Sequence, residues 1–263
     1  MPDLGLSVSI VSHGHGAAVI ALLEQLSALI QRGGTGPRRV FLTVNCPEPE
    51  LVSHVRDARW PFRLVLLENP APAGFGANHN RAFERDQSLG ASAVFGVLNP
   101  DIRLLGGHPF SDMLAVFAAT PEAACVYPRQ VDTSGAAQDH ERLLPTPARL
   151  LRRYLLGRPQ EVPAQAQAAA DWVNAAFVLL RSTALAQIGG FDERYHMYGE
   201  DVDLCLRLRL AGWTLMRADS VVVEHVAQRA SHRDLRHLAW HLASLLRLWR
   251  SPAYRRFRRS QAT

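Results

Sequence analysis

Short runs of aliphatic and β-branched residues alternate, through the first half of the chain, with segments whose apolar residues recur at helical spacing. The runs are typical of buried strands, and they cover residues 6–12, 39–44, 62–67 and 91–98. The segments with helical spacing predict helices at residues 17–30, 78–85 and 111–119. This alternation favours an α/β fold with a mostly parallel sheet and right-handed crossovers.

The second half of the chain is less regular. Apolar runs predict strands at residues 124–128 and 220–223, whereas residues 172–181 fit either a strand or the start of a helix. A short helix is expected at residues 182–188. The stretch 132–171 is rich in arginine, alanine and glutamine, and we expect insertions or mobile loops there.

Two polar stretches punctuate the first half. Pro47 and Pro49 predict a polar turn after the second strand, and residues 69–80 predict a loop that leads into the next helix. The carboxyl ends of the predicted strands carry His13, Asn45 and Asp101, so we expect a ligand site at that edge of the sheet.

Composition sharpens the picture. The chain has 263 residues, of which 48% are hydrophobic, enough for one large domain with an appendage. All 29 basic residues are arginines, which excludes Schiff-base chemistry and a phosphate-binding lysine. Residues 229–263 hold nine arginines and one acid, whereas residues before 229 carry a small net negative charge. We therefore expect a main domain at 1–228 and a basic, amphipathic helical tail at 229–263.

The cysteines and the apolar stretches bear on location. Cys46, Cys125 and Cys205 are far apart and show no zinc or disulfide spacing, which fits a reduced cytoplasmic setting. No signal peptide is recognisable, and no stretch approaches the ~20 apolar residues of a membrane span. The sequence is compatible with peripheral attachment to the inner face of a bacterial cytoplasmic membrane.

Two acidic segments are candidates for chemistry. Asn99 and Asp101 follow a buried strand and could hold a hard cation that binds a diphosphate, although Asn-Pro-Asp is also an ordinary turn. Glu200, Asp201 and Asp203 gather at a predicted helix start, where carboxylates also serve as caps. Asp203 and Arg207 are spaced to pair. We expect Asp201 to be a general base.

Histidines offer a further metal ligand. His225 follows the apolar run 220–223, and such a histidine is usually structural unless a metal already lies at Asp101. His13 lies in the glycine-containing loop after the first strand, where its ring could stack on a base or cap a helix.

Five motifs occur in a characteristic order: SHG, GFGANHNRAF, LNPDI, WVNAAFVLLR and GGFDERYHMYGEDVDLCLRLRLAGW. Together they resemble the family 2 inverting glycosyltransferases, especially the rhamnosyltransferase-like branch. The resemblance runs from about residue 6 to residue 225 and implies a GT-A fold, a Rossmann-like mixed sheet flanked by helices. It also implies transfer of a sugar from a nucleotide-sugar donor, with Mg²⁺ or Mn²⁺ as the cofactor.

The resemblance also implies roles for individual residues. Asp101, Asn99 and His225 would hold the metal, Asp201 would be the catalytic base, and Glu200 would orient the acceptor or the base. The nucleotide-sugar pocket would be lined by Ser12, His13, Gly14, Asn45, Gly74, Phe75, Gly76, Asn80, Asn99 and Asp101. One departure concerns the base: the family has an Asp-Asn pair after the second strand, whereas this chain has only Asn45.

The basic tail leaves two interpretations open. Apolar residues from 235 to 249 recur at helical spacing and predict a helix that packs on the domain. Alternatively, the aromatic and arginine residues after Pro252, and a similar segment at 149–158, would meet an anionic membrane. A polyprenyl-diphosphate-linked acceptor would suit the second interpretation.

We therefore expect a metal-dependent enzyme that moves a sugar from a nucleotide-sugar donor to a glycan or lipid-linked acceptor. The donor would be dTDP-rhamnose, which carries L-rhamnose, or a UDP-sugar. Two alternatives are a non-catalytic sugar-nucleotide-binding relative and a nucleic-acid-binding protein that uses the tail. The acidic body disfavours nucleic acid, and the sequence leaves a homodimer open.

Overall fold

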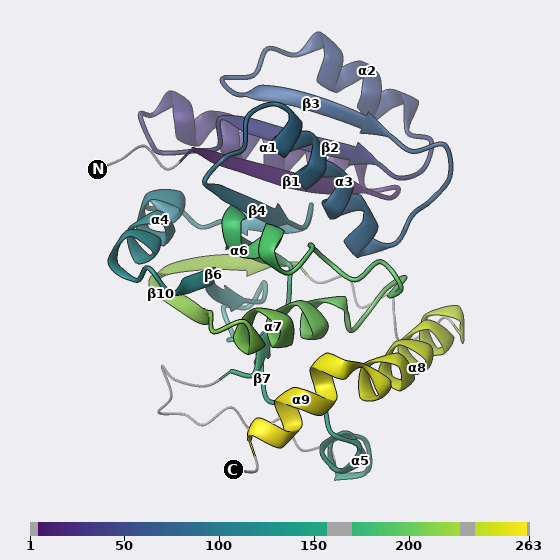
Figure 1. Cartoon of the computed structure of the whole chain (residues 1–263). Coiled ribbons are helices and arrows are strands. Elements are labelled where there is room, and N and C mark those ends of the chain that lie inside the picture. Colours follow the sequence, from purple (N-terminus) through teal and green to yellow (C-terminus); the bar gives the residue numbers. More distant parts are fainter. Residues whose placement is uncertain (1–4, 157–169, 227–234, 262–263) are drawn as a thin grey trace.

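A single mixed sheet organises the molecule, shown in Figure 1 as a computed structural model that describes residues 5–156, 170–226 and 235–261. The strands of the main sheet are β1 (Leu6–Ser12), β2 (Arg39–Val44), β3 (Arg63–Glu68), β4 (Val94–Leu98), β5 (Ile102–Leu104), β6 (Ala123–Val131), β9 (Phe177–Arg181) and β10 (Thr214–His225). A separate pair is formed by β7 (Glu141–Arg142) and β8 (Trp172–Val173).

The main sheet has eight strands in the order β3-β2-β1-β4-β9-β6-β10-β5. Strands β3, β2, β1 and β4 are mutually parallel, and β6 is parallel to β10. Strand β9 runs antiparallel to both β4 and β6, and β5 pairs antiparallel with β10. The predicted α/β class with a mostly parallel mixed sheet is confirmed.

Helices cover both faces of this sheet (Figure 1). They are α1 (Gly16–Gln31), α2 (Pro49–Asp57), α3 (Phe75–Ser88), α4 (Pro109–Ala119), α5 (Pro147–Leu156), α6 (Ser182–Gln187), α7 (Glu200–Leu210), α8 (Leu235–Arg250) and α9 (Pro252–Ser260). One core buries α1, α2 and α4 against the strands. A second core, on the other face, contains side chains of α3, α6, α7 and the two C-terminal helices.

Strand β1 shows how the sequence makes the two faces different. Val8 is fully buried in the first core, whereas its neighbours Ser7 and Ser9 point to the opposite face, as the period of two in a strand requires. There the Ser7 hydroxyl donates to Asp86 Oδ1 at 2.6 Å, and Ser9 Oγ bonds His79 Nδ1 at 2.8 Å. These buried polar contacts fix α3 against the sheet.

Several predicted boundaries were wrong. The predicted polar turn continues only to Glu48, because Pro49 occupies the first turn of α2 and Leu51 and Val55 bury the inner face of that helix. Helix α3 begins at Phe75, three residues before the predicted start. The stretch 132–171 contains β7 and α5 among its described residues.

The C-terminal helices pack on the domain over their described residues. Leu248 of α8 is fully buried, and Tyr254 and Phe257 of α9 are 3% and 4% exposed. Trp249 Nε1 donates to the Pro145 carbonyl at 2.8 Å. The predicted boundary at residue 228 falls within 227–234, which lie outside the described residues. Among the helices described, none is both long and apolar enough to cross a membrane.

Candidate active site

The carboxyl ends of six strands meet at one edge of the sheet. Parallel strands β1, β2, β3 and β4 end there, as do β6 and β10, because β9 is antiparallel to both β4 and β6. Most of the predicted site residues follow these strand ends. Open α/β sheets bind ligands at this position, so the fold itself assembles the candidate site.

Asp101 and His225 come together at this edge. Asp101 lies in the turn between β4 and β5, closed by a hydrogen bond from the Ile102 amide to the Asn99 carbonyl at 3.2 Å. Strand β5 then pairs with the end of β10 so that Ile102 lies opposite His225. His225 Nε2 is 3.5 Å from Asp101 Oδ1. The two predicted metal ligands, 124 positions apart in the sequence, are therefore neighbours.

This pair has the chemistry of a divalent-cation site that is completed by a substrate. Burial lowers the pKa of His225, so its imidazole is neutral and can offer a lone pair. No group of three or more histidine, cysteine or acidic ligands occurs among the residues that the structure describes. Mg²⁺, however, commonly takes one or two carboxylates and completes its shell with waters and substrate phosphates. Asp101 and His225 fit that arrangement.

Asn99 lies beside the pair, at the end of β4. Its backbone amide donates to the Ala176 carbonyl at 2.7 Å, which ties the end of β4 to the start of β9. Its side chain, two residues before that of Asp101, is half-buried and carries an amide oxygen that can bind the same cation.

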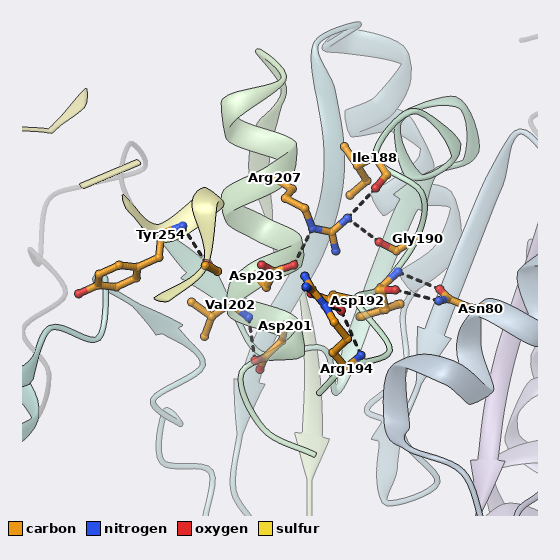
Figure 2. A network of polar contacts seen from close by, with 12 residues as sticks. Asn80, Ile188, Gly190, Asp192, Arg194, Asp201, Val202, Asp203, Arg207 and Tyr254 are labelled. Atoms are coloured by element: carbon orange, nitrogen blue, oxygen red, sulfur yellow. Dashed lines mark hydrogen bonds and ion pairs between the residues drawn. The ribbon is translucent and has the colours of Figure 1, made fainter. Parts of the chain in front are cut away.

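The start of α7 presents the three carboxylates. Tyr198 and Gly199 precede the helix with φ values of 70° and 82°, in the left-handed backbone region that glycine favours. Asp203 is engaged by Arg207, whose Nε lies 2.6 Å from Asp203 Oδ2, so the predicted i,i+4 pair is confirmed. Arg207 also donates to the Gly190 carbonyl at 2.7 Å (Figure 2). Asp203 therefore has a structural partner, which leaves Glu200 and Asp201.

Burial separates the acidities of these two carboxyls. Glu200 is 6% exposed, and its Oε2 has no hydrogen-bond partner among the described residues, so burial raises its pKa to about 8. Burial raises the pKa of Asp201 only to about 6, because the Val202 amide at 2.8 Å and the charge of Arg142 favour its ionised form. At neutral pH Asp201 is mostly ionised and Glu200 mostly protonated, which suits a base beside a neutral hydrogen-bond donor.

Arg142 was missed by the sequence reasoning. It lies on β7, paired with Trp172 of β8, and its guanidinium stacks 5.0 Å from the centre of that indole ring. An ion pair with Asp139 at 3.2 Å holds it in place. Nothing in the local sequence separates Arg142 from its neighbouring arginines, since only the β7–β8 pairing brings it to Asp201.

The first loop and Asn45 form a connected network. Ser12 Oγ accepts the His15 amide at 3.3 Å, and the Gly14 amide, at φ 78°, donates to Glu48 Oε1 at 2.9 Å. Asn45 accepts the Ala73 amide at 2.8 Å and donates to the Ala73 carbonyl at 3.0 Å. The amide of Asn45 thus fixes the 69–74 loop to the end of β2.

His13 is exposed in the same loop, and its Nδ1 lies 3.3 Å from Asn45 Nδ2. Of the residues predicted to line the nucleotide pocket, it is the one whose ring is open to solvent at the sheet edge.

The GFGANHN motif interlocks with the GGFDE motif. Asn80 accepts the Phe191 amide and donates to the Phe191 carbonyl, both at 2.8 Å, and donates to Glu193 at 2.9 Å. A Cβ on Gly76 would lie 2.7 Å from Phe191 Cβ, and one on Gly74 would lie 2.7 Å from the His196 carbonyl. The glycines therefore allow close approach of two segments, and the polar atoms of Asn80 face the protein.

Phe75 begins α3 between these segments. Its amide donates to the His196 carbonyl at 3.0 Å, and its half-buried ring lies 4.4 Å from that of His79 in an edge-on contact. Phe75 therefore joins α3 to the loop that leads to the carboxylates at the start of α7.

Comparison with known proteins identifies the family. A model of the family described as "Glycosyltransferase like family 2" matches residues 2–242. The chain belongs to this family. It is 31% identical over 202 residues to N-acetylglucosaminyl-diphospho-decaprenol L-rhamnosyltransferase of Mycobacterium tuberculosis, over 70% of this chain and 65% of that protein. This chain thus spans just under two thirds of that relative. It is also 26% identical over 255 residues to rhamnosyltransferase WbbL of Escherichia coli K12, over 91% and 90% of the two chains.

A solved structure supports the fold of this family 2 member. Mannosyltransferase PcManGT from Pyrobaculum calidifontis, in complex with GDP-Man and Mn²⁺, superposes with a TM-score of 0.60 at 15% identity, covering 92% of this chain and 64% of that one. The resemblance inferred from the motifs, to rhamnosyltransferase-like family 2 enzymes of GT-A fold, is confirmed.

Proposed function

We propose that this family 2 protein is a metal-dependent inverting glycosyltransferase that moves L-rhamnose from dTDP-rhamnose to a hydroxyl of a lipid-linked acceptor. The observation that carries the proposal is the contact between Asp101 and His225 at the carboxyl edge of a family 2 fold, and Asp201 at the start of α7 is the candidate base. The two relatives named rhamnosyltransferases support the choice of sugar.

Asp201 is the proposed base. Transfer with inversion is a single displacement in which the acceptor hydroxyl loses its proton as it attacks the sugar. Asp201 is half-buried at the start of α7, the Val202 amide donates to its Oδ1, and its carboxylate would take the proton of that hydroxyl. Glu200, protonated beside it, would donate a hydrogen bond to the acceptor or to Asp201.

Asp101, His225 and Asn99 would hold Mg²⁺ or Mn²⁺. A bound divalent cation neutralises the nucleoside diphosphate as it leaves. Asp101 would supply the negative charge and His225 a neutral nitrogen. The carbonyl of Asp101 accepts the Val226 amide at 3.0 Å and extends the pairing of β5 with β10.

The donor would lie over the loops at the same edge. We assign its nucleotide to the surface formed by His13, Gly14 and the loop that Asn45 fixes. In this assignment Ser12, Gly74, Gly76 and Asn80 shape the pocket through the protein contacts described above, and Phe75 forms one wall.

An acceptor on a polyprenyl diphosphate would place the protein at an anionic membrane. Leu151 of α5 is 60% exposed, and Leu242 and Leu246 of α8, which lie one helical turn apart, are 53% and 48% exposed. Arg247 and Arg250 lie in the last turn of α8, and α5 and α8 lie at the same end of the molecule (Figure 1). Exposed leucines interleaved with arginines suit the interface of an anionic bilayer.

A donor panel tests the function. Purified protein is incubated with dTDP-rhamnose, UDP-hexoses and GDP-mannose, each with Mg²⁺ or Mn²⁺ and an acceptor of N-acetylglucosamine on a polyprenyl diphosphate. Release of dTDP coupled to a new rhamnosyl product is expected. Equal or faster turnover of another donor would overturn the rhamnose assignment, and donor binding without transfer would favour a non-catalytic relative.

A further inference from the structure

A single glutamine side chain grips His225 at two points. Gln138 Oε1 lies 3.0 Å from His225 Nδ1, and Gln138 Nε2 donates to the His225 backbone carbonyl at 2.6 Å. Gln138 lies in the connection between β6 and β7, far in sequence from both acidic motifs.

The two contacts together fix which way the amide points. A backbone carbonyl oxygen can only accept a hydrogen bond, so the Gln138 atom that faces it must be the NH₂ nitrogen. The other end of the same amide is then the carbonyl oxygen, which also can only accept. His225 Nδ1 must therefore carry a hydrogen and donate it to Gln138.

A neutral imidazole has one N–H. With that hydrogen on Nδ1, His225 Nε2 carries a lone pair, and it is this nitrogen that lies 3.5 Å from Asp101 Oδ1. Two lone-pair-bearing atoms so close repel each other unless a proton or a cation lies between them. The hydrogen bond to Gln138 thus prepares His225 as a ligand for a cation that Asp101 also binds.

Gln138 is itself held firmly by its backbone. Its amide donates to the Gln130 carbonyl at 2.9 Å, and its carbonyl accepts the His140 amide at 3.0 Å and contacts His140 Nδ1 at 2.8 Å. Gln130 in turn bonds Asn174, at the start of the segment that leads into β9. The grip on His225 is therefore part of an ordered network at the sheet edge.

We propose that Gln138 is a positioning residue that sets the tautomer of His225 and so tunes the affinity of the Asp101–His225 pair for a divalent cation. This inference rests on the proposed metal dependence of the enzyme. Gln138 contacts His225 through both its ring and its backbone carbonyl, and it would act on the cation only through His225.

The tautomer is measured in the metal-free protein. Protein labelled with ¹⁵N-histidine is studied by NMR at pH 8, and the His225 signals are assigned by their loss in His225→Ala. In the wild type, Nδ1 is expected at the shift of a protonated nitrogen and Nε2 at that of an unprotonated one. The reverse pattern would overturn the proposal whether or not the enzyme transfers rhamnose.

Two substitutions at Gln138 separate tautomer control from simple tethering. Gln138→Met removes both contacts, so we expect mixed tautomers and a 10- to 100-fold loss of Mn²⁺ affinity, as is typical when a ligand's outer partner is lost. Gln138→Glu cannot donate to the His225 carbonyl, yet its carboxylate still accepts from Nδ1 and makes the ring more basic, so the wild-type tautomer and an affinity at least as high as that of the wild type are expected. The matched control is Gln187→Met, at the end of α6, which removes the acceptor of the Trp213 Nε1 hydrogen bond.

Mn²⁺ binding is read from the electron paramagnetic resonance of the unbound ion, with dTDP present, and thermal melting confirms that each variant folds. Gln138→Met with wild-type affinity, or Gln138→Glu that fails as Gln138→Met does, would overturn the proposal. Retained Mn²⁺ binding without rhamnosyl transfer would instead count against the proposed function and leave the role of Gln138 standing.

Discussion

The burial of Glu200 predicts how the free energy of unfolding changes with pH, and this test needs no substrate. Because burial raises its pKa to about 8, well above the ordinary value of 4.5, the folded protein keeps the Glu200 proton while the unfolded chain releases it. Below pH 4.5 both states are protonated and there is no effect. As pH rises from there towards 8, the unfolded state binds fewer protons than the folded state, so the free energy of unfolding falls.

The size of this fall follows from the pKa difference. Each pH unit within that window costs about 1.4 kcal/mol, so between pH 5.5 and 7.0 Glu200 should lower stability by about 2 kcal/mol. Glu200→Gln has no proton to lose and removes this slope. Any cost of the unpaired amide of the new glutamine is the same at every pH and does not affect the comparison.

Urea unfolding followed by circular dichroism at pH 5.5, 6.0, 6.5 and 7.0 measures the effect. The difference in unfolding free energy between Glu200→Gln and wild type should shift by about 2 kcal/mol in favour of the variant across this range. Glu24→Gln, at an exposed position on α1, removes the same charge and should leave the wild-type slope intact. Parallel pH curves for Glu200→Gln and wild type would refute the reasoning, since Glu200 would then ionise alike in both states.

Three further outcomes are expected. Asp201→Asn should lower transfer by about 10²- to 10⁴-fold with donor affinity unchanged. Because the base must be ionised, the wild-type kcat/KM should fall about tenfold per pH unit below pH 6. A flat profile between pH 5 and 6 would contradict this. Asp101→Asn should weaken Mn²⁺ binding by more than about tenfold, as measured by calorimetry with dTDP present. Leu242→Ser combined with Leu246→Ser should reduce co-sedimentation with phosphatidylglycerol vesicles, whereas Leu105→Ser, at a leucine 54% exposed, should not; equal binding by both would remove α8 from the membrane surface.

Local patterns predicted the regular half of the fold well. Strands β1, β2 and β4 are buried runs whose residues pack on both faces of the sheet, so their composition alone marks them. Helix α2 was missed because its sequence opens with prolines and acids, which are common in turns. Only the burial of its inner face against the sheet makes it a helix.

The sequence predicted those site residues whose side-chain type serves few purposes at the end of a strand. Asp101 and His225 were named from the sequence, and the pairing of β5 with β10 brings them together. Gln138 and Arg142 were not found, because glutamine and arginine are frequent in that stretch and their roles arise from contacts distant in sequence. Asn80 was predicted from the motif to face a nucleotide, whereas its polar atoms hold Phe191 and Glu193.

The stereochemistry of the product is the most direct test of a single displacement with Asp201 as the base. The protein is incubated with dTDP-rhamnose, Mn²⁺ and a polyprenyl-diphosphate-linked N-acetylglucosamine, and the anomeric configuration of the new linkage is read by NMR. We expect a configuration opposite to that of the donor and loss of product formation in Asp201→Asn. A retained configuration, or wild-type turnover by Asp201→Asn, would contradict the assignment of Asp201 as the base of a single displacement.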